Sequence, residues 1–353
     1  MSFKTRVVRI DPDEPDSVAI AEAAAILRAG GLVAFPTETV YGLGADATNP
    51  EAVARIFEAK GRPATNPLIV HASDASGARR CVADWPDRAE ILAARYWPGP
   101  LTLVLPRSPD IPDIVTAGQA TVGVRVPRPK AARVLIDFAG RPIAAPSANR
   151  STGISPTRAE HVLKDLDGKI DLILDSRSFA TVGLESTVLD LTGKVPRVLR
   201  PGTITREEIA ATLGEPVEGS DAASPRSPGQ MSVHYAPRVP TYRIERHEFV
   251  AHPTGGSYVL ISIGPTVKPW PRGSFRPVGH IRLKTPGMAN GWFYFYLHTY
   301  DRIGKYDRLV DFIVIIPPPD EPRWRAIRDR IWRASVPWPG HFSRPPRGEE
   351  TPV

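Results

Sequence analysis

The sequence predicts an α/β protein: a twisted sheet of mixed strand direction flanked by helices, followed by a smaller second domain. Three observations predict this class. Short apolar runs of the kind that form buried strands alternate with segments whose apolar residues recur at helical spacing. Glycine, proline and asparagine mark tight turns between these segments. A chain of 353 residues, 42% of them hydrophobic, is long enough for two domains with separate cores.

We expect the chain to be organised around residues 30–71. This stretch places hydroxyl, carboxylate, cationic and amide side chains between two apolar strands, which a loop with only a structural role does not need. Asn49 and Pro50 predict a helix start, and Gly61 predicts its end. We expect the glycine-bordered turn to let the backbone approach a ligand, because glycine has no Cβ. The expected order is a strand at 32–35, a polar loop at 36–39, the turn at 41–44, a helix at 51–60 and a strand at 68–70.

The remaining elements follow from helical spacing and from short apolar runs bounded by turn residues. In the front of the chain we expect helices at residues 16–28, 73–82, 86–97, 130–138, 155–166 and 205–214, and strands at 101–105, 121–126, 142–146, 171–175, 186–191 and 197–199. Residues 215–230, rich in Gly, Ser, Pro and Ala, predict a linker. Behind it we expect strands at 257–263 and 312–316, a helix with a basic face at 321–334 and a disordered tail at 344–353.

The positive charge is concentrated in the back of the chain. Residues 1–220 contain 26 Lys+Arg and 27 Asp+Glu, whereas residues 221–353 contain 19 and 11. This balance fits a polyanionic partner such as RNA, and it also fits an arginine-rich solvated surface. The sequence shows no run of 18 apolar residues and no secretory signal, and Cys81 is the sole cysteine. We therefore expect no membrane span, no internal disulfide and a cytoplasmic location.

The main candidates for binding phosphate or carboxylate are four cations at loop or strand-end positions: Lys60, Arg62, Arg125 and Arg200. Arginine can grip either anion through two parallel hydrogen bonds. The chain has no GxxxxGK[ST], HExxH or CxxC motif, so neither a P-loop nor a zinc site is expected. Glu38 or Glu185 could help to hold Mg²⁺ through a phosphate. Structural alternatives stay open; His71, for example, follows an apolar strand and could be a buried core histidine.

Nine sequence blocks occur in the order found in a known family. They are PTETVYGLG at 36–44, KGRP at 60–63, NPLIVH at 66–71, WPGPLT at 97–102, VRVP at 124–127, APSAN at 145–149, EST at 185–187, RPG at 200–202 and HYAP at 234–237. With these blocks the sequence resembles the YrdC-type L-threonylcarbamoyladenylate synthases in their long, two-domain form. The last hundred or so residues match this pattern less well, and residues 267–291 depart from it.

The resemblance implies a YrdC-like twisted, mixed, open sheet with flanking helices and a smaller Rossmann-like α/β domain. The implied boundaries are a catalytic domain at 1–212, a linker reaching over the active site at 213–238, a C-terminal domain at 239–343 and a tail at 344–353. The implied reaction converts L-threonine, bicarbonate and ATP, with Mg²⁺, into L-threonylcarbamoyladenylate and pyrophosphate. Its product would supply a downstream transferase that modifies the adenosine next to the tRNA anticodon. Any contact of this chain with tRNA is expected to be indirect.

The family's binding positions carry over residue by residue. Those for ATP are Lys60, Arg62, Asn66, Thr121, Ser147, Asn149, Ser155, Arg200 and Tyr235. Those for L-threonine are Thr39, His71, Arg125, Ala145 and Ser186. Lys60 and Arg62 are the expected catalytic pair, since they would neutralise phosphate charge as pyrophosphate leaves. No metal site made of protein ligands is expected.

Two other functions remain open at this point. The basic back third is compatible with a module that binds double-stranded RNA or the ribosome, and such a module would bind RNA in a salt-dependent way without ATP turnover. A related carbamoyltransferase is the other alternative. Chains of that kind usually carry zinc-finger or kinase-like segments, and none is visible here.

Overall fold

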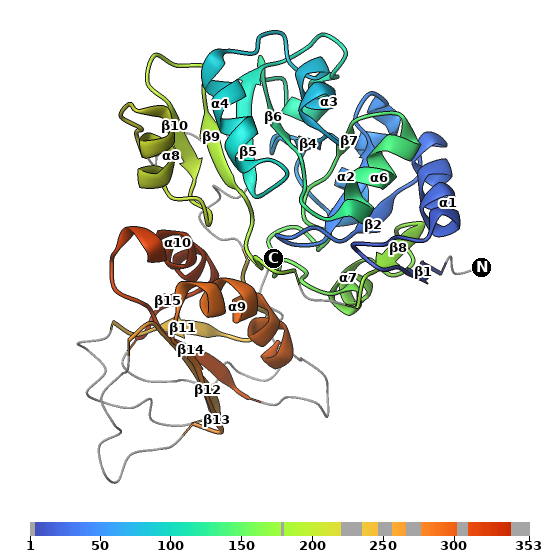
Figure 1. Cartoon of the computed structure of the whole chain (residues 1–353). Helices are drawn as coiled ribbons and strands as arrows, with labels where there is room; N and C mark the ends of the chain where they lie inside the picture. Colours follow the sequence, from blue (N-terminus) through green and yellow to red (C-terminus); the bar gives the residue numbers. More distant parts are fainter. Residues whose placement is uncertain are drawn as a thin grey trace.

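The computed structural model describes residues 4–177, 180–219, 235–245, 256–265, 277–301 and 310–339 and arranges them around two sheets (Figure 1). The front of the chain, blue to yellow-green in the figure, folds around the larger sheet. The orange and red part folds around the smaller one. Helices α9 (Pro286–Tyr300) and α10 (Arg325–Ala334) lie between the smaller sheet and the front domain.

The larger sheet has, in the described part of the chain, ten strands in the order β1-β8-β2-β3-β7-β4-β6-β5-β9-β10. It mixes parallel and antiparallel pairs, which confirms the predicted class. The parallel pairing of β4 with β6 places His71 beside Arg125, two residues far apart in sequence. The strands are β1 (Arg6–Arg9), β2 (Val33–Phe35), β3 (Gly42–Asp46), β4 (Ile69–His71), β5 (Leu101–Pro106), β6 (Thr121–Arg125), β7 (Ile143–Ala144), β8 (Leu172–Asp175), β9 (Thr187–Asp190) and β10 (Arg197–Arg200).

Helices cover both faces of this sheet. Val33 and Phe35 of β2 pack in the core beneath α1 and α6, while Ala34 between them belongs to the core on the other face. This alternation is the period of two that a strand imposes on its side chains. The helices are α1 (Ser17–Arg28), α2 (Pro50–Lys60), α3 (Ala75–Arg80), α4 (Asp87–Tyr96), α5 (Asp113–Thr116), α6 (Lys130–Ala139), α7 (Ala159–Leu166) and α8 (Arg206–Leu213).

The helix boundaries follow the capping signals of the sequence. The Asn49 side chain accepts hydrogen bonds from the amides of Glu51 and Ala52 at the start of α2. Gly61 ends that helix in the left-handed conformation, with φ of 60°, which glycine adopts without steric cost. At α8, which was predicted at 205–214, Thr205 and Glu208 form a capping box. These ends therefore need only local sequence to be specified.

Two predictions for the front domain are wrong in detail. The turn expected at 41–44 is instead the start of β3, which pairs with β2. A Cβ on Gly44 would lie 2.9 Å from side-chain atoms of Phe35 and of Ile143, so this glycine serves close packing between strands. Gly42, in the same stretch, lines the cavity described below. The helix expected from residue 155 begins only at Ala159, and Arg158 precedes it without a side-chain cap.

The smaller sheet is parallel throughout, in the order β13-β12-β14-β11-β15. Its strands are β11 (Thr241–Arg243), β12 (Tyr258–Ile263), β13 (Gly279–Leu283), β14 (Phe312–Ile316) and β15 (Val336–Pro337), and the short helix η1 (Pro322–Trp324) precedes α10. A parallel sheet joined by helical crossovers is the arrangement expected of a Rossmann-like domain. Strand β13 and helix α9 had no counterpart among the predicted elements, although Thr285 caps α9 and Pro286 occupies its first turn.

The predicted basic face of the last helix is only partly basic. Arg330 of α10 lies on the same side as Ala326, Ile327 and Ala334 and is fully buried. Most of the predicted linker at 213–238 and the tail at 344–353 lie outside the described residues, so the domain boundaries stay predictions. No helix in the described ranges is both long and apolar enough to cross a bilayer.

Candidate active site

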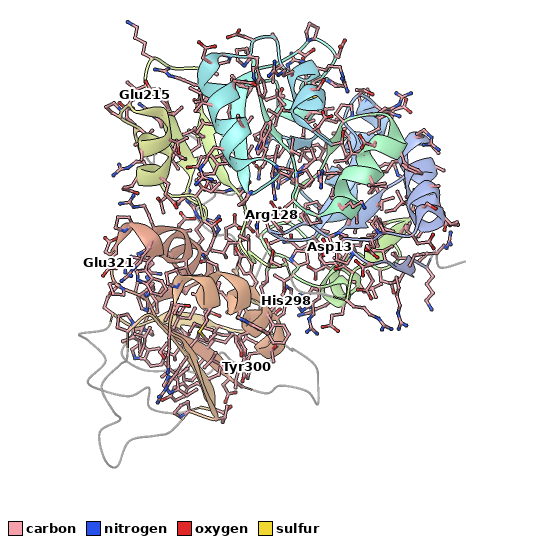
Figure 2. The ribbon with its side chains drawn as sticks, viewed as in Figure 1. Asp13, Arg128, Glu215, His298, Tyr300 and Glu321 are labelled. Carbon is pink, nitrogen blue, oxygen red and sulfur yellow. The ribbon has the colours of Figure 1, made fainter. Side chains whose placement is uncertain are left out.

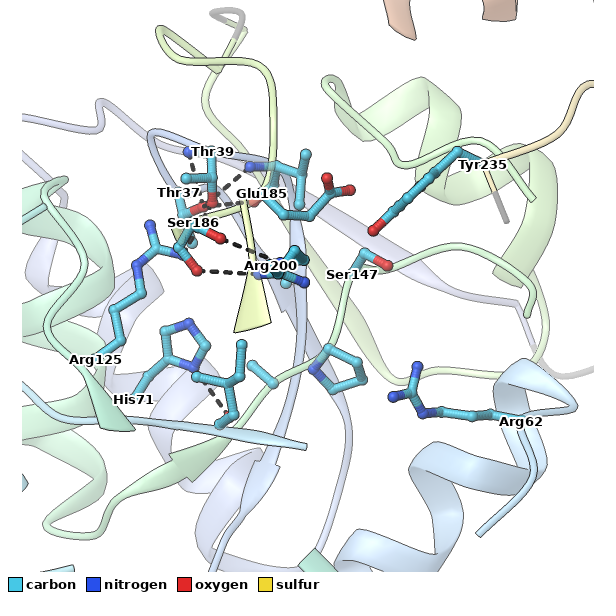
Figure 3. Close-up of a pocket in the computed structure, with 15 residues that line it drawn as sticks. Thr37, Thr39, Arg62, His71, Arg125, Ser147, Glu185, Ser186, Arg200 and Tyr235 are labelled. Atoms are coloured by element: carbon cyan, nitrogen blue, oxygen red, sulfur yellow. Dashed lines mark hydrogen bonds between the residues drawn. The ribbon is translucent and has the colours of Figure 1, made fainter. Parts of the chain in front are cut away.

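One cavity is lined by residues from strands, loops and the predicted linker (Figure 3). It encloses about 550 Å³, including the part that opens to solvent. In Figure 3, Arg125 and His71 lie on one side of it, and Arg62 and Tyr235 lie on the other. Its lining is Thr37, Thr39, Val40, Gly42, Arg62, Ile69, His71, Arg125, Ala145, Pro146, Ser147, Glu185, Ser186, Arg200 and Tyr235. Nine of the predicted site residues are thus brought together.

Arg125 is held by three groups. Its Nε donates to the carbonyl of Gly99 at 3.2 Å, and its Nη1 donates to Thr39 Oγ1 at 3.0 Å. Its Nη2 forms an ion pair of 2.7 Å with Glu38 Oε1, and both side chains are buried. The second Glu38 oxygen accepts from the backbone amide of Arg128. Arg125 therefore reaches the cavity with fixed geometry and with a compensated charge.

His71 lies at the end of β4, next to Arg125. Burial and the nearby Arg125 guanidinium lower the pKa of its imidazole to about 3, so the ring is neutral at physiological pH. Its Nδ1 lies 3.3 Å from the carbonyl of Ile69. His71 is therefore buried, as expected of a core histidine, and it also lines the cavity, as expected of a binding residue.

Arg200 and Ser186 form one unit. Arg200 Nε donates to the Ser186 carbonyl at 3.1 Å, and Nη2 donates to Ser186 Oγ at 3.1 Å. Ser186 Oγ also shares a hydrogen bond of 2.8 Å with Thr102 Oγ1. Ser186 was predicted for threonine and Arg200 for the nucleotide. Their direct contact places the two predicted subsites next to each other.

Arg62 and Lys60, the predicted catalytic pair, take different positions. Arg62 lines the cavity and is anchored by hydrogen bonds from Nε and Nη2 to the carbonyls of Asn66 and Pro67. Burial lowers its pKa to about 10, so it stays cationic at neutral pH. Lys60 Nζ instead donates to the carbonyls of Ser147, at 2.5 Å, and Asn149, and the residue is not part of the lining. It ties the end of α2 to the Ser147 loop.

Four other predicted ATP residues do not line the cavity. Asn149 Nδ2 donates to the carbonyls of Arg150 and Gly153 within its own loop. Ser155 Oγ donates to Glu185 Oε1 at 2.5 Å. Thr121 lines a smaller neighbouring hollow that shares Ile69 with the main cavity. Asn66 lines neither of these two hollows, and its carbonyl accepts a hydrogen bond from Arg62 Nε.

The sequence named Glu185 only as a candidate near a metal, yet it lines the cavity with its carboxylate in the centre of a buried network. In the sequence, only the EST block at 185–187 indicated that Glu185 belongs to the site. Tyr235, the residue that follows the undescribed segment 220–234, is 1% exposed and adopts a left-handed φ of 62°. That conformation is uncommon for a tyrosine and marks a position over-determined by its surroundings.

The acidic residues of the site leave little for a metal ion. Glu38 is paired with Arg125, and Glu185 accepts from Ser155, Tyr294 and Arg330. Within the described ranges no three His, Cys, Asp or Glu side chains are grouped so that they could hold a metal. The donor set therefore fits a divalent cation that arrives coordinated by phosphate oxygens, and it does not fit a resident metal centre.

Comparison with known proteins agrees with this geometry. A family model described as telomere recombination, covering Sua5, YciO and YrdC, matches residues 25–202. A second one, described as the C-terminal domain of threonylcarbamoyl-AMP synthase, matches residues 204–336. The first match includes the larger sheet from β2 onward, and the second includes the smaller sheet except for Pro337, the last residue of β15.

Individual relatives extend over most of the chain. A threonylcarbamoyl-AMP synthase of Bacillus subtilis is 42% identical over 330 residues, which span 90% of this chain and 92% of that protein. One from Pyrococcus abyssi is 50% identical over 228 residues, or 63% of this chain and 67% of that protein. The crystal structure of P. abyssi Sua5 complexed with L-threonine superimposes with a TM-score of 0.81 and 36% identity, covering 94% of this chain and 99% of that one. The chain therefore belongs to the threonylcarbamoyl-AMP synthase family, in its long form with a C-terminal domain.

Proposed function

We propose that the chain is an L-threonylcarbamoyladenylate synthase, which forms this product and pyrophosphate from L-threonine, bicarbonate and ATP. The observation that supports it most directly is the convergence of Arg62, Arg125 and Arg200 on one cavity. Three guanidinium groups at one cavity suit a reaction between an amino acid, which has a carboxylate, and a nucleoside triphosphate.

The threonine side of the cavity is the side of Arg125. In the proposal, the amino-acid carboxylate binds in front of this guanidinium, beside Thr39 and the neutral His71. The amine of threonine then adds to the carbon of bicarbonate, and water leaves, which gives a carbamate. Ser186 and the backbone at Ala145 complete this subsite. The neutral imidazole of His71 accepts or donates a hydrogen bond without adding a charge that would compete for the carboxylate.

The nucleotide side is the side of Arg62 and Arg200. Here the carbamate oxygen attacks the α-phosphorus in line, the bond from that phosphorus to the bridging oxygen of the leaving group breaks, and pyrophosphate departs. Arg62, Arg200 and Ser147 are placed to bind phosphate oxygens as charge moves onto the leaving group. Mg²⁺ bound to ATP would neutralise part of that charge, and the paired state of Glu38 and Glu185 supports its entry with the nucleotide.

An apolar strip beyond Ile69 is the proposed place for the base. Ile69, Val104, Val188 and Leu199 form a small cluster on one face of the sheet. Thr121 lies in the hollow that borders this strip. An aromatic base can bury its faces against such a strip while polar groups at the rim read its edge. This arrangement gives Thr121 a role that fits its position outside the main cavity.

Tyr235 restricts access to the cavity. Its buried ring lies at the nucleotide side, near Arg200 and Glu185. The product is a mixed anhydride that water hydrolyses, so a site that excludes water protects it. The proposed product then passes to a downstream tRNA-modifying transferase. Because the product is used to modify tRNA, we assign the chain to the cytoplasm.

A pyrophosphate-release assay tests the function. The chain is incubated with ATP and Mg²⁺, L-threonine and bicarbonate are omitted in turn, and the nucleotide product is identified by its mass. We expect release only when all substrates are present, together with a product of the mass of L-threonylcarbamoyladenylate. Release that ignores both omissions would indicate a general ATPase. Salt-dependent RNA binding without turnover would indicate a nucleic-acid module.

A further inference from the structure

The carboxylate of Glu185 is held by two side chains of the C-terminal domain. Arg330 Nε of α10 donates to Glu185 Oε2 at 2.8 Å, and the hydroxyl of Tyr294 on α9 lies 3.2 Å from Oε2 and 3.3 Å from Oε1. Ser155 of the front domain donates to Oε1. Arg330 is completely buried, and its partner lies 145 residues away in the sequence. A wall residue of the cavity thus takes its ionic partner from the other domain.

This pairing matters because Glu185 is ionised next to the proposed phosphate subsite. Burial alone would raise its pKa, but the charges of Arg330 and Arg200 and the hydrogen bond from Ser155 lower it to about 2. An uncompensated carboxylate at this position would repel a polyanionic nucleotide. The Arg330 guanidinium supplies the compensating charge, and it also pairs with Asp329 through Nη1 at 2.6 Å.

The same two residues support Tyr235. The Arg330 guanidinium carbon lies 5.2 Å from the centre of the Tyr235 ring, a cation–π distance. The ring of Tyr294 lies 5.6 Å from that of Tyr235. Tyr235 has an unfavourable backbone conformation for its residue type, so it needs such neighbours to stay in place. Arg330 therefore contacts two residues of the cavity lining, Glu185 and Tyr235.

The backbone also fits closely at this contact. Gly183, two residues before Glu185, has a φ of 71°, and a Cβ there would lie 2.3 Å from the carbonyl oxygen of Asn290 in α9. Helix α9 consequently packs directly against the segment that leads to Glu185. His298 of α9 lies where this helix meets the front domain (Figure 2). Its Nε2 is 3.1 Å from the carbonyl oxygen of Ser155.

We propose that Arg330, assisted by Tyr294, is a positioning residue of the nucleotide site: it neutralises Glu185 and fixes Tyr235, so the C-terminal domain sets the affinity for ATP. This inference rests on the proposed function, because it presumes that ATP binds in the cavity. It assigns the C-terminal domain a specific task in catalysis, which neither its fold nor its sequence indicates.

The test measures KM for ATP and for L-threonine in Arg330→Met, using the full chain. We expect KM for ATP to rise about tenfold or more, because Glu185 is left without its counter-ion, and KM for L-threonine to stay within about twofold. Arg328→Met is the matched control: this arginine lies on the same helix, pairs with Asp320 and does not reach the cavity, so both KM values should stay unchanged.

A second variant tests the charge argument. Adding Glu185→Gln to Arg330→Met removes the uncompensated charge, and we expect it to recover most of the lost ATP affinity. No recovery, an unchanged KM for ATP in Arg330→Met, or equal rises for both substrates would overturn the inference. If circular dichroism shows that Arg330→Met does not fold, Tyr294→Phe decides: KM for ATP should rise about threefold, and an unchanged value would refute the proposal. A wild-type chain without turnover would instead refute the proposed function.

Discussion

The predicted catalytic pair separates into two roles when contacts of single residues are considered. The Arg62 guanidinium reaches the cavity, whereas the Lys60 ammonium is used by two backbone carbonyls of the Ser147 loop. Burial lowers the pKa of Lys60 well below its usual value, with the Arg62 charge as a second cause. The two residues should therefore respond differently to substitution.

We expect Arg62→Ala to lower kcat/KM about a hundredfold or more, because it removes a charge at the proposed leaving group. Lys60→Met should lower the free energy of unfolding by about 1–3 kcal/mol, because two buried carbonyls lose their donor. Steady-state kinetics and urea unfolding of both variants check this. A Lys60→Met variant with wild-type stability and a large loss of kcat would restore the direct catalytic role that the sequence suggested.

A substitution that tests Arg125 also affects Glu38, the carboxylate with which it forms a buried ion pair. Arg125→Ala would leave a buried carboxylate unpaired, and loss of activity could then reflect misfolding. Arg125→Lys keeps the charge but loses the fork that holds Thr39, Gly99 and Glu38 together. We expect its KM for L-threonine to rise about tenfold, with KM for ATP nearly unchanged. Equal changes for both substrates would argue against Arg125 as the threonine residue.

At the scale of elements, β3 is specified by packing against its neighbours more than by its own composition. A strand with two glycines is unusual, and the crowding at Gly44 explains one of them. The side chains of Phe35 and Ile143 come from β2 and β7, the two strands that flank β3. The glycine is thus needed only because three strands meet at this point.

Gly44→Ala should therefore destabilise the front domain by about 1–3 kcal/mol, the usual cost of overpacking a core. Chemical denaturation measures this directly. Gly287→Ala provides the control, since a Cβ at that position in α9 meets nothing within 4 Å and an alanine there favours the helix. If Gly44→Ala were as stable as the wild type, the strands would have to separate enough to hold the methyl group.

At the scale of the whole molecule, the two domains are joined through buried polar groups. His161 of α7 and His298 of α9 stack across the contact with ring centres 3.8 Å apart. Lys164 of α7 pairs with Asp301 at 3.0 Å, just after α9 ends. Two stacked imidazole rings repel each other when both are protonated. We therefore expect this contact between the domains to weaken at low pH.

Acid should lower the stability of the fold through its buried histidines. Burial is the main cause that lowers the pKa of His161 to about 3 and that of His298 well below its usual value; His71 also has a pKa of about 3. Above the unfolded value of about 6.5 these groups are neutral in both states. Below it the unfolded chain binds protons that the folded chain does not, so stability falls as the pH drops from about 6.5 toward 3.

When the pH falls from 7 to 5, each of these histidines should lower the free energy of unfolding by about 2 kcal/mol. Urea unfolding at the two pH values measures the sum. In His298→Gln, whose amide can still donate to Ser155, the difference between the two pH values should shrink by about that amount. The same loss in the variant and the wild type would show that His298 does not report on the domain contact.

Local sequence determined much of the fold and located the site. Caps, glycine stops and periodicity predicted most helices and strands of the front domain, because these signals act over only a few neighbouring residues. The motif blocks contain all fifteen residues of the cavity lining, and nine of these had been named as binding residues. Helix α9 was missed because aromatic residues also occupy the side opposite its buried face, with Trp292 38% exposed, and this blurs the helical period.

Only the tertiary structure decided which of those polar groups face the cavity and which hold the protein together. Lys60 and Asn149 lie in motif blocks, yet the loops that pack around them supply their partners, and no sequence spacing reports such a contact. Glu185 and Arg330 lie in different domains, and only the folded chain brings them together as an ion pair. The physical reason is that a buried charge is governed by whatever lies within a few ångströms of it, and chain folding, not sequence distance, sets that neighbourhood.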